Sequence, residues 1–334
     1  MIAVLVTGAT GYIGSHVCKL LKDAGYAVVG VDRVRREHTL KHMHEFVEAD
    51  YAGPECFKLL AEYQAISAVV HCAGTSLVGP SVLDPAEYYT NNVAKTAMFL
   101  SVLKSLPNPP VVIFSSSAAV YGEPDVDLIE VNQPWNPLSP YGQSKAMIEL
   151  MLTDMCRAYG LTAMSLRYFN ACGADHEGEL GQAPDATHII ARLLESVRDH
   201  KEFTLYGDDY PTADGTCVRD YVHVEDLAQA HMMAIQYCMS FGDAQRGNHY
   251  MLNLGTGRGY SNQEIIDAVK QYVGPVEVVV GDRRPGDPAR LVAGTVLSGI
   301  TLGWSPERSD LETIINSAWK WYNNPSNLVD NESK

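Results

Sequence analysis

Tyr141 and Lys145 lie four residues apart at the start of a predicted helix, so their side chains share one helix face and can meet. A free phenol has a pKa of about 10, and a nearby ammonium group stabilises its ionised form. We therefore expect Lys145 to lower the pKa of Tyr141 until the tyrosine can act as a general base near neutral pH. Taken alone, this spacing fits a surface pair as well as a catalytic one.

Three serines, Ser115, Ser116 and Ser117, end the β-branched run that precedes this helix. Ligands of parallel sheets bind at the carboxyl ends of the strands. The last hydroxyl, that of Ser117, could therefore hydrogen-bond a reacting oxygen of a substrate. This third group favours the catalytic interpretation, and we predict Ser117, Tyr141 and Lys145 as the catalytic residues.

A glycine-rich turn, Gly8-Ala9-Thr10-Gly11-Tyr12-Ile13-Gly14, follows the first predicted strand and opens the first helix. Such glycines let backbone amides approach a pyrophosphate at a helix N-terminus, although they also mark ordinary tight turns. Asp32 ends the second predicted strand, where a carboxylate accepts from ribose hydroxyls and repels a 2′-phosphate, which favours NAD over NADP. Arg33 and Arg35 could pair with such a phosphate or be solvated loop residues. Asp50, after the third predicted strand, is placed to meet the adenine edge.

Short β-branched runs alternate with longer amphipathic segments, which predicts a parallel sheet covered on both faces. We expect an α/β fold with a Rossmann-type doubly wound parallel sheet in residues 1–172 and a smaller mixed α/β C-terminal substrate domain in residues 173–334. The segment near residues 216–240 is a candidate to pack back onto the first domain. Strands are predicted at Ile2–Val6, Ala27–Val31, Ala68–His71, Val111–Ser115 and Ala163–Arg167, and helices at Tyr141–Tyr159, Ile189–Arg198, Val224–Tyr237, Ser261–Tyr272 and Asp310–Asn323.

The composition limits the classes of function. A net charge of −15, with no basic run longer than Arg33–Arg36, argues against nucleic-acid binding, which needs clustered cations. Seven scattered cysteines without a CxxC pair fit reduced thiols in a cytoplasmic enzyme. The chain has no apolar run of about 18 residues that could span a membrane. His42 and His44 lack a third ligand at metal-binding spacing, so we expect solvated side chains and no metal.

Further motifs extend the pattern over nearly the whole chain. They include HCAG at 71–74, EYYTNNV at 87–93, FSSSAAVYG at 114–122, LRYFNACGA at 166–174 and, most specifically, GDDYPTADGTCVRDYVHVEDLA at 207–228. With these motifs the chain resembles the UDP-glucose 4-epimerase family of the extended short-chain dehydrogenase/reductase superfamily. The resemblance implies NAD-dependent inversion of C4 between UDP-glucose and UDP-galactose, in which hydride returns to either face of a 4-keto sugar. It also implies a homodimer, with the helix that contains Met147–Met155 and a helix near Ala94–Leu106 as the candidate interface.

The resemblance also assigns site residues. Ser117 and Tyr141 would contact the C4 oxygen, and Lys145 would hold the nicotinamide ribose. The NAD site would comprise Gly8, Gly11, Tyr12, Ile13, Gly14, Asp32, Asp50, Ala73, Asn92, Tyr141, Lys145 and Phe169. The UDP-sugar site would comprise Ser117, Tyr141, Asn170, His188, Tyr206 against the uracil, Arg219 and Arg284 at the diphosphate, Asp287 near the uridine ribose, and Leu291. The arginines agree with the chemistry, because a pyrophosphate calls for fork-shaped donors.

Three positions depart from the family pattern. Ser76 replaces a lysine of the cofactor pocket, which would weaken NAD retention. Leu291 is intermediate between the tyrosine that restricts some members to plain hexoses and the small residues that admit N-acetyl sugars. His188 replaces an asparagine and would serve the substrate phosphate or cap a helix.

Other functions remain to be separated from this one. A 4,6-dehydratase would need an Asp-Glu pair after the catalytic hydroxyl, where this chain has Ala118 and Ala119. The main alternative is a 4-epimerase of UDP-N-acetylhexosamines or UDP-pentoses. A non-catalytic dinucleotide-binding protein is the third candidate, although such relatives usually lose the tyrosine or lysine that this chain keeps.

Overall fold

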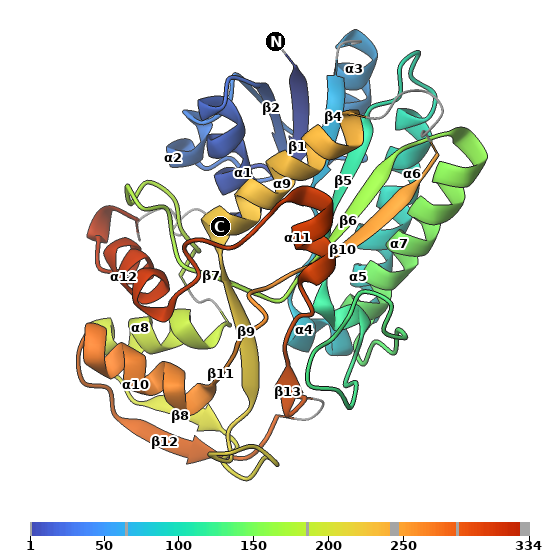
Figure 1. The fold of residues 1–334 in the computed structure, drawn as a ribbon. Coiled ribbons are helices and arrows are strands. Elements are labelled where there is room, and N and C mark those ends of the chain that lie inside the picture. Colours follow the sequence, from blue (N-terminus) through green and yellow to red (C-terminus); the bar gives the residue numbers. More distant parts are fainter. Residues whose placement is uncertain (1, 64–65, 185–186, 241–246, 285–286, 328–334) are drawn as a thin grey trace.

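The larger lobe of the molecule is built on a seven-stranded sheet (Figure 1). The computed structural model describes residues 2–63, 66–184, 187–240, 247–284 and 287–327. All neighbouring strands of this sheet run parallel, in the order β10-β6-β5-β4-β1-β2-β3. The strands are β1 (Ala3–Thr7), β2 (Ala27–Asp32), β3 (Glu45–Glu48), β4 (Ile66–His71), β5 (Val111–Ser117), β6 (Ala163–Tyr168) and β10 (His249–Leu254).

Helices cover both faces of this sheet, which confirms the Rossmann-type doubly wound fold. On one face α1 (Tyr12–Asp23) packs against α9 (Val224–Met239). The other face carries α3 (Pro54–Glu62), α6 (Lys95–Leu103) and α7 (Pro140–Tyr159). Apolar side chains from both faces of β1 are fully buried, with Val4 and Val6 in one core cluster and Leu5 in the other. Such two-sided burial explains the continuous apolar runs of the sequence.

Short helices join these elements. They are α2 (Glu37–Leu40), α4 (Val78–Leu83), α5 (Pro85–Tyr88), the π-helix η1 (Tyr89–Ala94) and the 3-10 helix η2 (Ala118–Val120). Near the C-terminus α11 (Val296–Leu302) packs on α9 and β10, and η4 (Pro325–Asn327) follows the last α-helix.

The smaller lobe has its own core and mixed sheets. In it β9 (Val218–His223) pairs with β7 (Asn170–Cys172), β11 (Gly259–Ser261) and β13 (Arg290–Leu291), and β8 (Phe203–Tyr206) pairs with β12 (Val278–Gly281). The helices α8 (Ile189–Asp199), α10 (Asn262–Tyr272) and α12 (Leu311–Tyr322) pack together beside them. The start of α10 is fixed by a capping box, in which the Ser261 hydroxyl accepts from the Glu264 amide and the Glu264 carboxylate accepts from the Ser261 amide.

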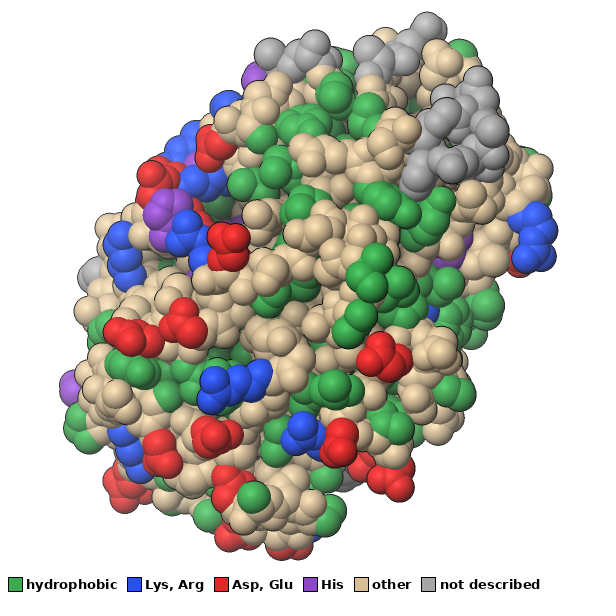
Figure 2. Space-filling model, viewed as in Figure 1, with side chains coloured by type: hydrophobic (Ala, Val, Ile, Leu, Met, Phe, Trp, Pro, Cys, Tyr) green, Lys and Arg blue, Asp and Glu red, His purple; other side chains and the backbone are tan. Residues whose placement is uncertain are grey.

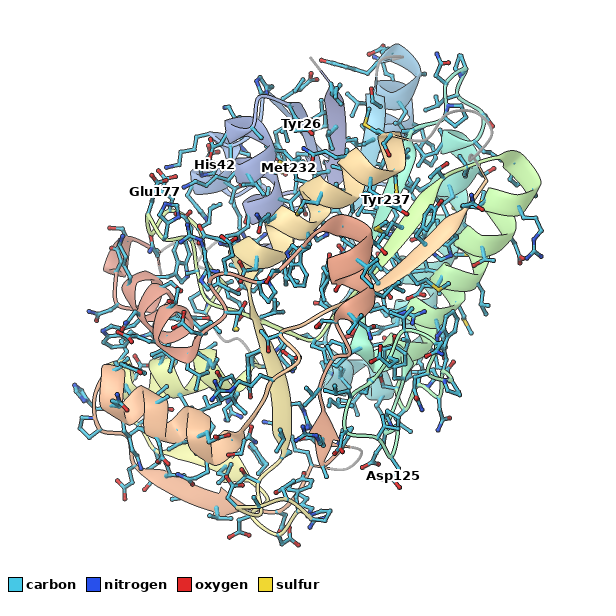
Figure 3. The ribbon with its side chains drawn as sticks, in the orientation of Figure 1. Tyr26, His42, Asp125, Glu177, Met232 and Tyr237 are labelled. Carbon is cyan, nitrogen blue, oxygen red and sulfur yellow. The ribbon has the colours of Figure 1, made fainter. Side chains whose placement is uncertain are left out.

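Two segments beyond residue 173 complete the larger lobe. Strand β10 extends the sheet beside β6, and α9 lies against α1. Tyr26 and Met232, labelled in Figure 3, belong to the core on this face, and the Tyr26 hydroxyl accepts a hydrogen bond of 3.3 Å from Gln236 of α9. The larger lobe is therefore made from two parts of the chain, and the strand at β10 was not predicted.

The environment of His42 differs from the expected one. His42 is 5% exposed, and its Nε2 lies 3.5 Å from a Glu179 carboxylate oxygen, whereas we had expected a solvated side chain. The loop after β7 folds back over this region, as the neighbouring labels of His42 and Glu177 in Figure 3 show. The acidic side chains of this loop surround the ammonium group of Lys19, which bonds to Asp175, Glu177 and Glu179. The histidine is thus covered by an ion-pair network that joins the two lobes.

The surface carries both signs of charge. On the face shown in Figure 2, acidic and basic side chains are interspersed over the smaller lobe. Within the described residues, none of the helices combines the length and the hydrophobicity that crossing a bilayer requires.

Candidate active site

A single cleft of about 1350 Å³ runs between the carboxyl ends of the parallel strands and the smaller lobe. It brings together most residues that the sequence predicted for a cofactor and a substrate. Those lining it are Gly8, Gly11, Tyr12, Ile13, Gly14, Asp32, Ala73, Ser117, Tyr141, Lys145, Phe169, Asn170, His188, Arg219, Arg284, Asp287 and Leu291. Asp50, Asn92 and Tyr206 are not among the lining residues.

The glycine turn is shaped so that the phosphates of a ligand can closely approach the protein backbone. Gly8 has φ +69°, and a Cβ at this position would lie 2.8 Å from the Ala73 nitrogen. A Cβ on Gly14 would lie 2.1 Å from the Gly8 carbonyl oxygen. Helix α1 begins at Tyr12 with Gly11 as its N-cap residue and no side-chain cap, which leaves its first amides facing the cleft. These features fit the pyrophosphate of a dinucleotide.

The carboxylate of Asp32 stands beside this turn. It accepts hydrogen bonds from the amides of Thr10 at 3.1 Å and Val34 at 3.2 Å, which hold it at the cleft wall. Of the two arginines that raised the question of NADP, Arg33 lines the cleft and Arg35 pairs with Glu37. Arg36 also lines the cleft, and its Nη1 donates to the Thr10 hydroxyl at 3.1 Å. Asp32 therefore remains the only carboxylate at this end among the described lining residues.

Asp50 and Asn92 lie behind the cleft wall. Burial by itself would raise the pKa of Asp50, but the ion pair with Lys95 and a hydrogen bond from the Ala52 amide together lower it. The Asn92 side chain is 1% exposed and bonds to the Thr75 amide at 2.8 Å and the Ser144 hydroxyl at 3.0 Å. In the structure these two side chains support the walls, and direct contact with a cofactor stays a prediction for both.

The predicted catalytic pair stands at the first turn of α7. The Ser139 hydroxyl accepts from the Gly142 amide at 3.2 Å and Pro140 occupies the first turn, which fixes where the helix begins. Tyr141 and Ser117 both line the cleft, and the Ser117 hydroxyl acts on the phenol as a polar partner that favours its ionised form. The Ser117 hydroxyl also accepts from the Ala119 amide at 3.2 Å, so its orientation is set by η2. Strand β5 and helix α7 thus bring the hydroxyl groups of Ser117 and Tyr141 to the wall of the same cleft.

The pKa of Tyr141 differs from our expectation. Burial raises it above its ordinary value, and the Ser117 hydroxyl offsets only part of that rise. Lys145 donates to the Ser115 carbonyl at 2.7 Å, and its Nζ lies 5.7 Å from the centre of the Tyr141 ring. Burial also lowers the pKa of Lys145 to about 8. In the protein without ligand, desolvation therefore has a larger effect on the phenol than the ammonium group does.

Arg219 and Asp287 form an ion pair at the other end of the cleft. The Arg219 guanidinium also donates to the carbonyls of Pro288 at 2.6 Å and Val218 at 2.8 Å, and the residue is 8% exposed. Its position is therefore fixed before any ligand arrives. Both Nη2 hydrogens are used by Asp287 and Pro288, so contact of Arg219 with a diphosphate stays a prediction.

Tyr206 is held beside the cleft by two arginines. The Arg284 guanidinium carbon lies 4.1 Å from its ring centre and that of Arg192 lies 5.6 Å away. Hydrogen bonds from both arginines, that of Arg284 first, lower the pKa of the Tyr206 hydroxyl. The sequence analysis missed Arg192, which lines the cleft one helical turn after His188. The four-residue spacing between His188 and Arg192 on α8 was the signal in the sequence that could have revealed this residue.

The three departures from the family pattern all face the cleft. Ser76 and His188 are exposed there. His188 is the N-cap residue of α8, but its side chain makes no capping hydrogen bond, so the structure favours a ligand-facing role. Leu291 packs against the cluster that contains Phe169 and Trp135 and forms part of the wall near Ser117.

The comparisons with known proteins agree with this geometry. Residues 4–251 match the NAD dependent epimerase/dehydratase family. The chain belongs to this family. It is 39% identical over 340 aligned positions to the UDP-glucose 4-epimerase of Halalkalibacterium halodurans, covering 99% of both chains.

Two solved structures of family members are similar throughout. The UDP-glucose 4-epimerase of Brucella ovis, in complex with NAD, has a TM-score of 0.90 at 42% identity and covers 96% of this chain and 98% of its own. The UDP-glucose 4-epimerase of Stenotrophomonas maltophila, with bound NAD and formylated UDP-arabinopyranose, has a TM-score of 0.90 at 34% identity and covers 97% of this chain and 98% of its own. The division into a parallel-sheet lobe and a smaller C-terminal lobe is therefore that of the family.

Proposed function

We propose that this protein is an NAD-dependent 4-epimerase that interconverts UDP-glucose and UDP-galactose. One observation carries the proposal: a single cleft is lined by Ser117, Tyr141 and Lys145, by the glycine cradle of the larger lobe and by Arg219 of the smaller lobe. A dinucleotide held at the cradle and a nucleotide sugar held by Arg219 would meet at Ser117 and Tyr141. The relatives' names, all UDP-glucose 4-epimerases, support the same substrate.

The residues divide the reaction between them. Gly8, Gly11 and Asp32 would hold NAD, which when bound would supply the acceptor and donor for the C4 hydride. Tyr141 in its ionised form accepts the C4 hydroxyl proton as the C4–H bond breaks, which gives a 4-keto sugar, and returns the proton when the sugar is reduced again. Ser117 holds the C4 oxygen, and Lys145 holds the nicotinamide ribose. Hydride leaves and returns once, so the reaction has no net oxidation.

Inversion requires the keto sugar to present its other face. The fixed pair of Arg219 and Asp287 suits anchoring of the UDP part, with Arg284 and Tyr206 beside it. The cleft between this anchor and Ser117 has room for a hexose that turns about its phosphate linkage. A tightly held cofactor next to a roomy sugar site is therefore consistent with epimerisation.

A 4-epimerase of UDP-N-acetylhexosamines or UDP-pentoses is the second candidate. Leu291 lies in the wall near Ser117 and is smaller than tyrosine, which leaves space beside the sugar for an N-acetyl group. The relative from Stenotrophomonas maltophila holds a pentose nucleotide. The two candidates share one mechanism and differ in substrate breadth.

We further propose a homodimer and a cytoplasmic location. Helices α6 and α7 contact each other and carry exposed apolar side chains, including Met98 at 54% and Leu150 at 55% exposure. All seven cysteines are free thiols, as in proteins of a reducing compartment. Light scattering of the purified protein should give twice the mass of one chain, and a monomer would contradict the dimer.

A substrate panel tests the function. The purified protein is incubated without added NAD with UDP-galactose, UDP-N-acetylgalactosamine or UDP-arabinose, and C4 inversion is followed by proton NMR. We expect inversion of UDP-galactose. Inversion of UDP-N-acetylgalactosamine or UDP-arabinose without inversion of UDP-galactose would replace the proposal by the second candidate. No inversion in any tube, even with NAD added, would reject a 4-epimerase.

A further inference from the structure

Strand β5 and helix α7 are joined by successive contacts. Tyr141, Lys145 and Glu149 follow one another at four-residue steps, so they form one row along the helix face. The Ser115 carbonyl accepts from the Lys145 ammonium at 2.7 Å, and the Ser116 hydroxyl donates to the Glu149 carboxylate. Ser117 lines the cleft together with Tyr141 and favours the ionised form of its phenol.

Glu149 also forms a buried ion pair with Arg167 of β6. Both side chains are 0% exposed. The Arg167 Nε lies 3.0 and 3.2 Å from the two Glu149 oxygens, and its Nη2 lies 2.6 Å from one of them. A buried ion pair adds little net stability, because the cost of desolvating two charges offsets their attraction. Glu149 belongs to the same helix row as Tyr141 and Lys145. This position points to a role of the ion pair other than stability.

A series of hydrogen bonds connects the Glu149–Arg167 pair to the wall of the sugar site. The Arg167 Nη1 donates to the Tyr121 hydroxyl at 2.6 Å, and that hydroxyl donates to the Asn253 side chain at 2.6 Å. Asn253 donates to the Ile129 carbonyl at 2.7 Å, and the Ile129 amide donates to the Val292 carbonyl at 2.8 Å. Val292 directly follows Leu291. An unbroken chain of hydrogen bonds thus connects the catalytic helix to the segment that bears Leu291.

We propose that Glu149 and Arg167 are a positioning pair, which sets the place of helix α7 against strand β5 and so aligns Tyr141 with Ser117. This inference rests on the proposed function for its kinetic consequence. The pair touches neither substrate nor cofactor and acts through the residues that do. A shift of α7 along β5 would move the Tyr141 hydroxyl away from the C4 oxygen, and a displacement of about 1 Å at a reacting group can cost roughly a hundredfold in rate.

Ser116→Ala tests the link with the least disturbance. The Glu149 oxygen that loses the serine keeps the Arg167 Nε at 3.0 Å, so the change leaves no unpaired charge. Ser298→Ala is the control, because Ser298 is also buried and its hydroxyl bonds to the Thr295 carbonyl at 2.7 Å, at the start of α11. We expect Ser116→Ala to lower kcat for UDP-galactose by roughly tenfold, with KM and bound NAD within about twofold of the parent. The control should have the kcat of the parent. The melting temperatures of the variant and the control should be similar.

Tyr121→Phe serves as the second variant if Ser116→Ala does not fold, and it should lower kcat in the same way. Equal kcat values for the variant and the Ser298→Ala control would overturn the proposal. Crystal structures supply a readout that does not depend on activity. In Ser116→Ala the Lys145 ammonium should no longer lie within hydrogen-bond distance of the Ser115 carbonyl, from which it is 2.7 Å away in the parent. Retention of that contact would overturn the positioning role even if the parent proved inactive. An inactive parent would by itself reject only the proposed function.

Discussion

The ammonium group of Lys145 donates a hydrogen bond of 2.7 Å to the backbone carbonyl of Ser115, which turns it toward the strand and leaves it 5.7 Å from the Tyr141 ring centre. Lys145 is therefore fixed at the end of β5 before any ligand binds. The polar group that favours the ionised form of Tyr141 is the Ser117 hydroxyl. The lysine is thus better placed to hold a cofactor ribose than to bond the phenol.

Tyr141→Phe should remove the proton acceptor and leave binding intact. We expect turnover of UDP-galactose to fall by roughly a hundredfold or more, which is the scale of a lost general base. The NAD content of the purified protein and its affinity for UDP should remain those of the parent, as calorimetry can check. Turnover close to that of the parent would reject Tyr141 as the base.

Asp32→Ala should weaken NAD binding, because the Asp32 carboxylate lines the cleft and we propose that it accepts from the cofactor ribose. We expect less NAD in the purified protein and restoration of activity by added NADP, which the carboxylate otherwise repels. Asp23→Ala is a suitable control, since Asp23 is exposed at the end of α1. The prediction fails if the Asp32 variant retains NAD as firmly as the control does.

Arg219→Lys should impair binding of the nucleotide sugar more than its conversion. The change keeps a positive charge near Asp287 but replaces the fork of donors by a single ammonium group. We expect KM for UDP-galactose to rise by roughly tenfold, with kcat changed by less than about threefold. Arg258→Lys, outside this cleft, is the control. A parental KM in the Arg219 variant would remove Arg219 from the substrate site.

Stability should fall as the pH drops below about 6.5, because several histidines are buried without charge. Burial lowers the pKa of His71 and His223 to about 3 and that of His231 to about 4. The unfolded chain binds protons at these groups at a higher pH than the folded chain does. Their contribution is therefore fully present above the unfolded pKa and is lost progressively as the pH falls toward the folded values.

Each such histidine should cost about 1.4 kcal/mol of unfolding free energy between about pH 7.5 and 5.5. Urea unfolding at the two pH values measures this loss. In His71→Gln the fall in unfolding free energy should be smaller by the contribution of one histidine. The side chain at this position, which lies between Thr7 and Thr96, no longer titrates in the variant. An identical pH dependence in parent and variant would contradict the assignment.

The features predicted correctly from the sequence have local signals. The start of α7 follows from the Ser139 cap and Pro140, and its end from Gly160 in the left-handed conformation. The fold class followed from the alternation of strands and helices in the first half. The placement of Tyr141 beside Ser117 needed only the helix period and the rule that ligands bind at strand ends.

The features that were missed depend on tertiary contacts. Strand β10 pairs with β6, a partner far away in the sequence, and nothing within His249–Leu254 specifies which sheet it joins. The rise in the pKa of Tyr141 depends on how many elements cover it. Likewise, Glu149 and Arg167 come from a helix and a strand whose contact no spacing reveals.

The most direct test of the account follows the hydrogen on C4. UDP-galactose carrying deuterium at C4 is incubated with the purified protein in ordinary water without added NAD, and the UDP-glucose formed is analysed by NMR and mass spectrometry. Because hydride leaves C4 and returns to it within one closed site, the product should carry deuterium at C4. Product with solvent hydrogen at C4 would contradict transfer through a retained cofactor, and with it the proposed reaction.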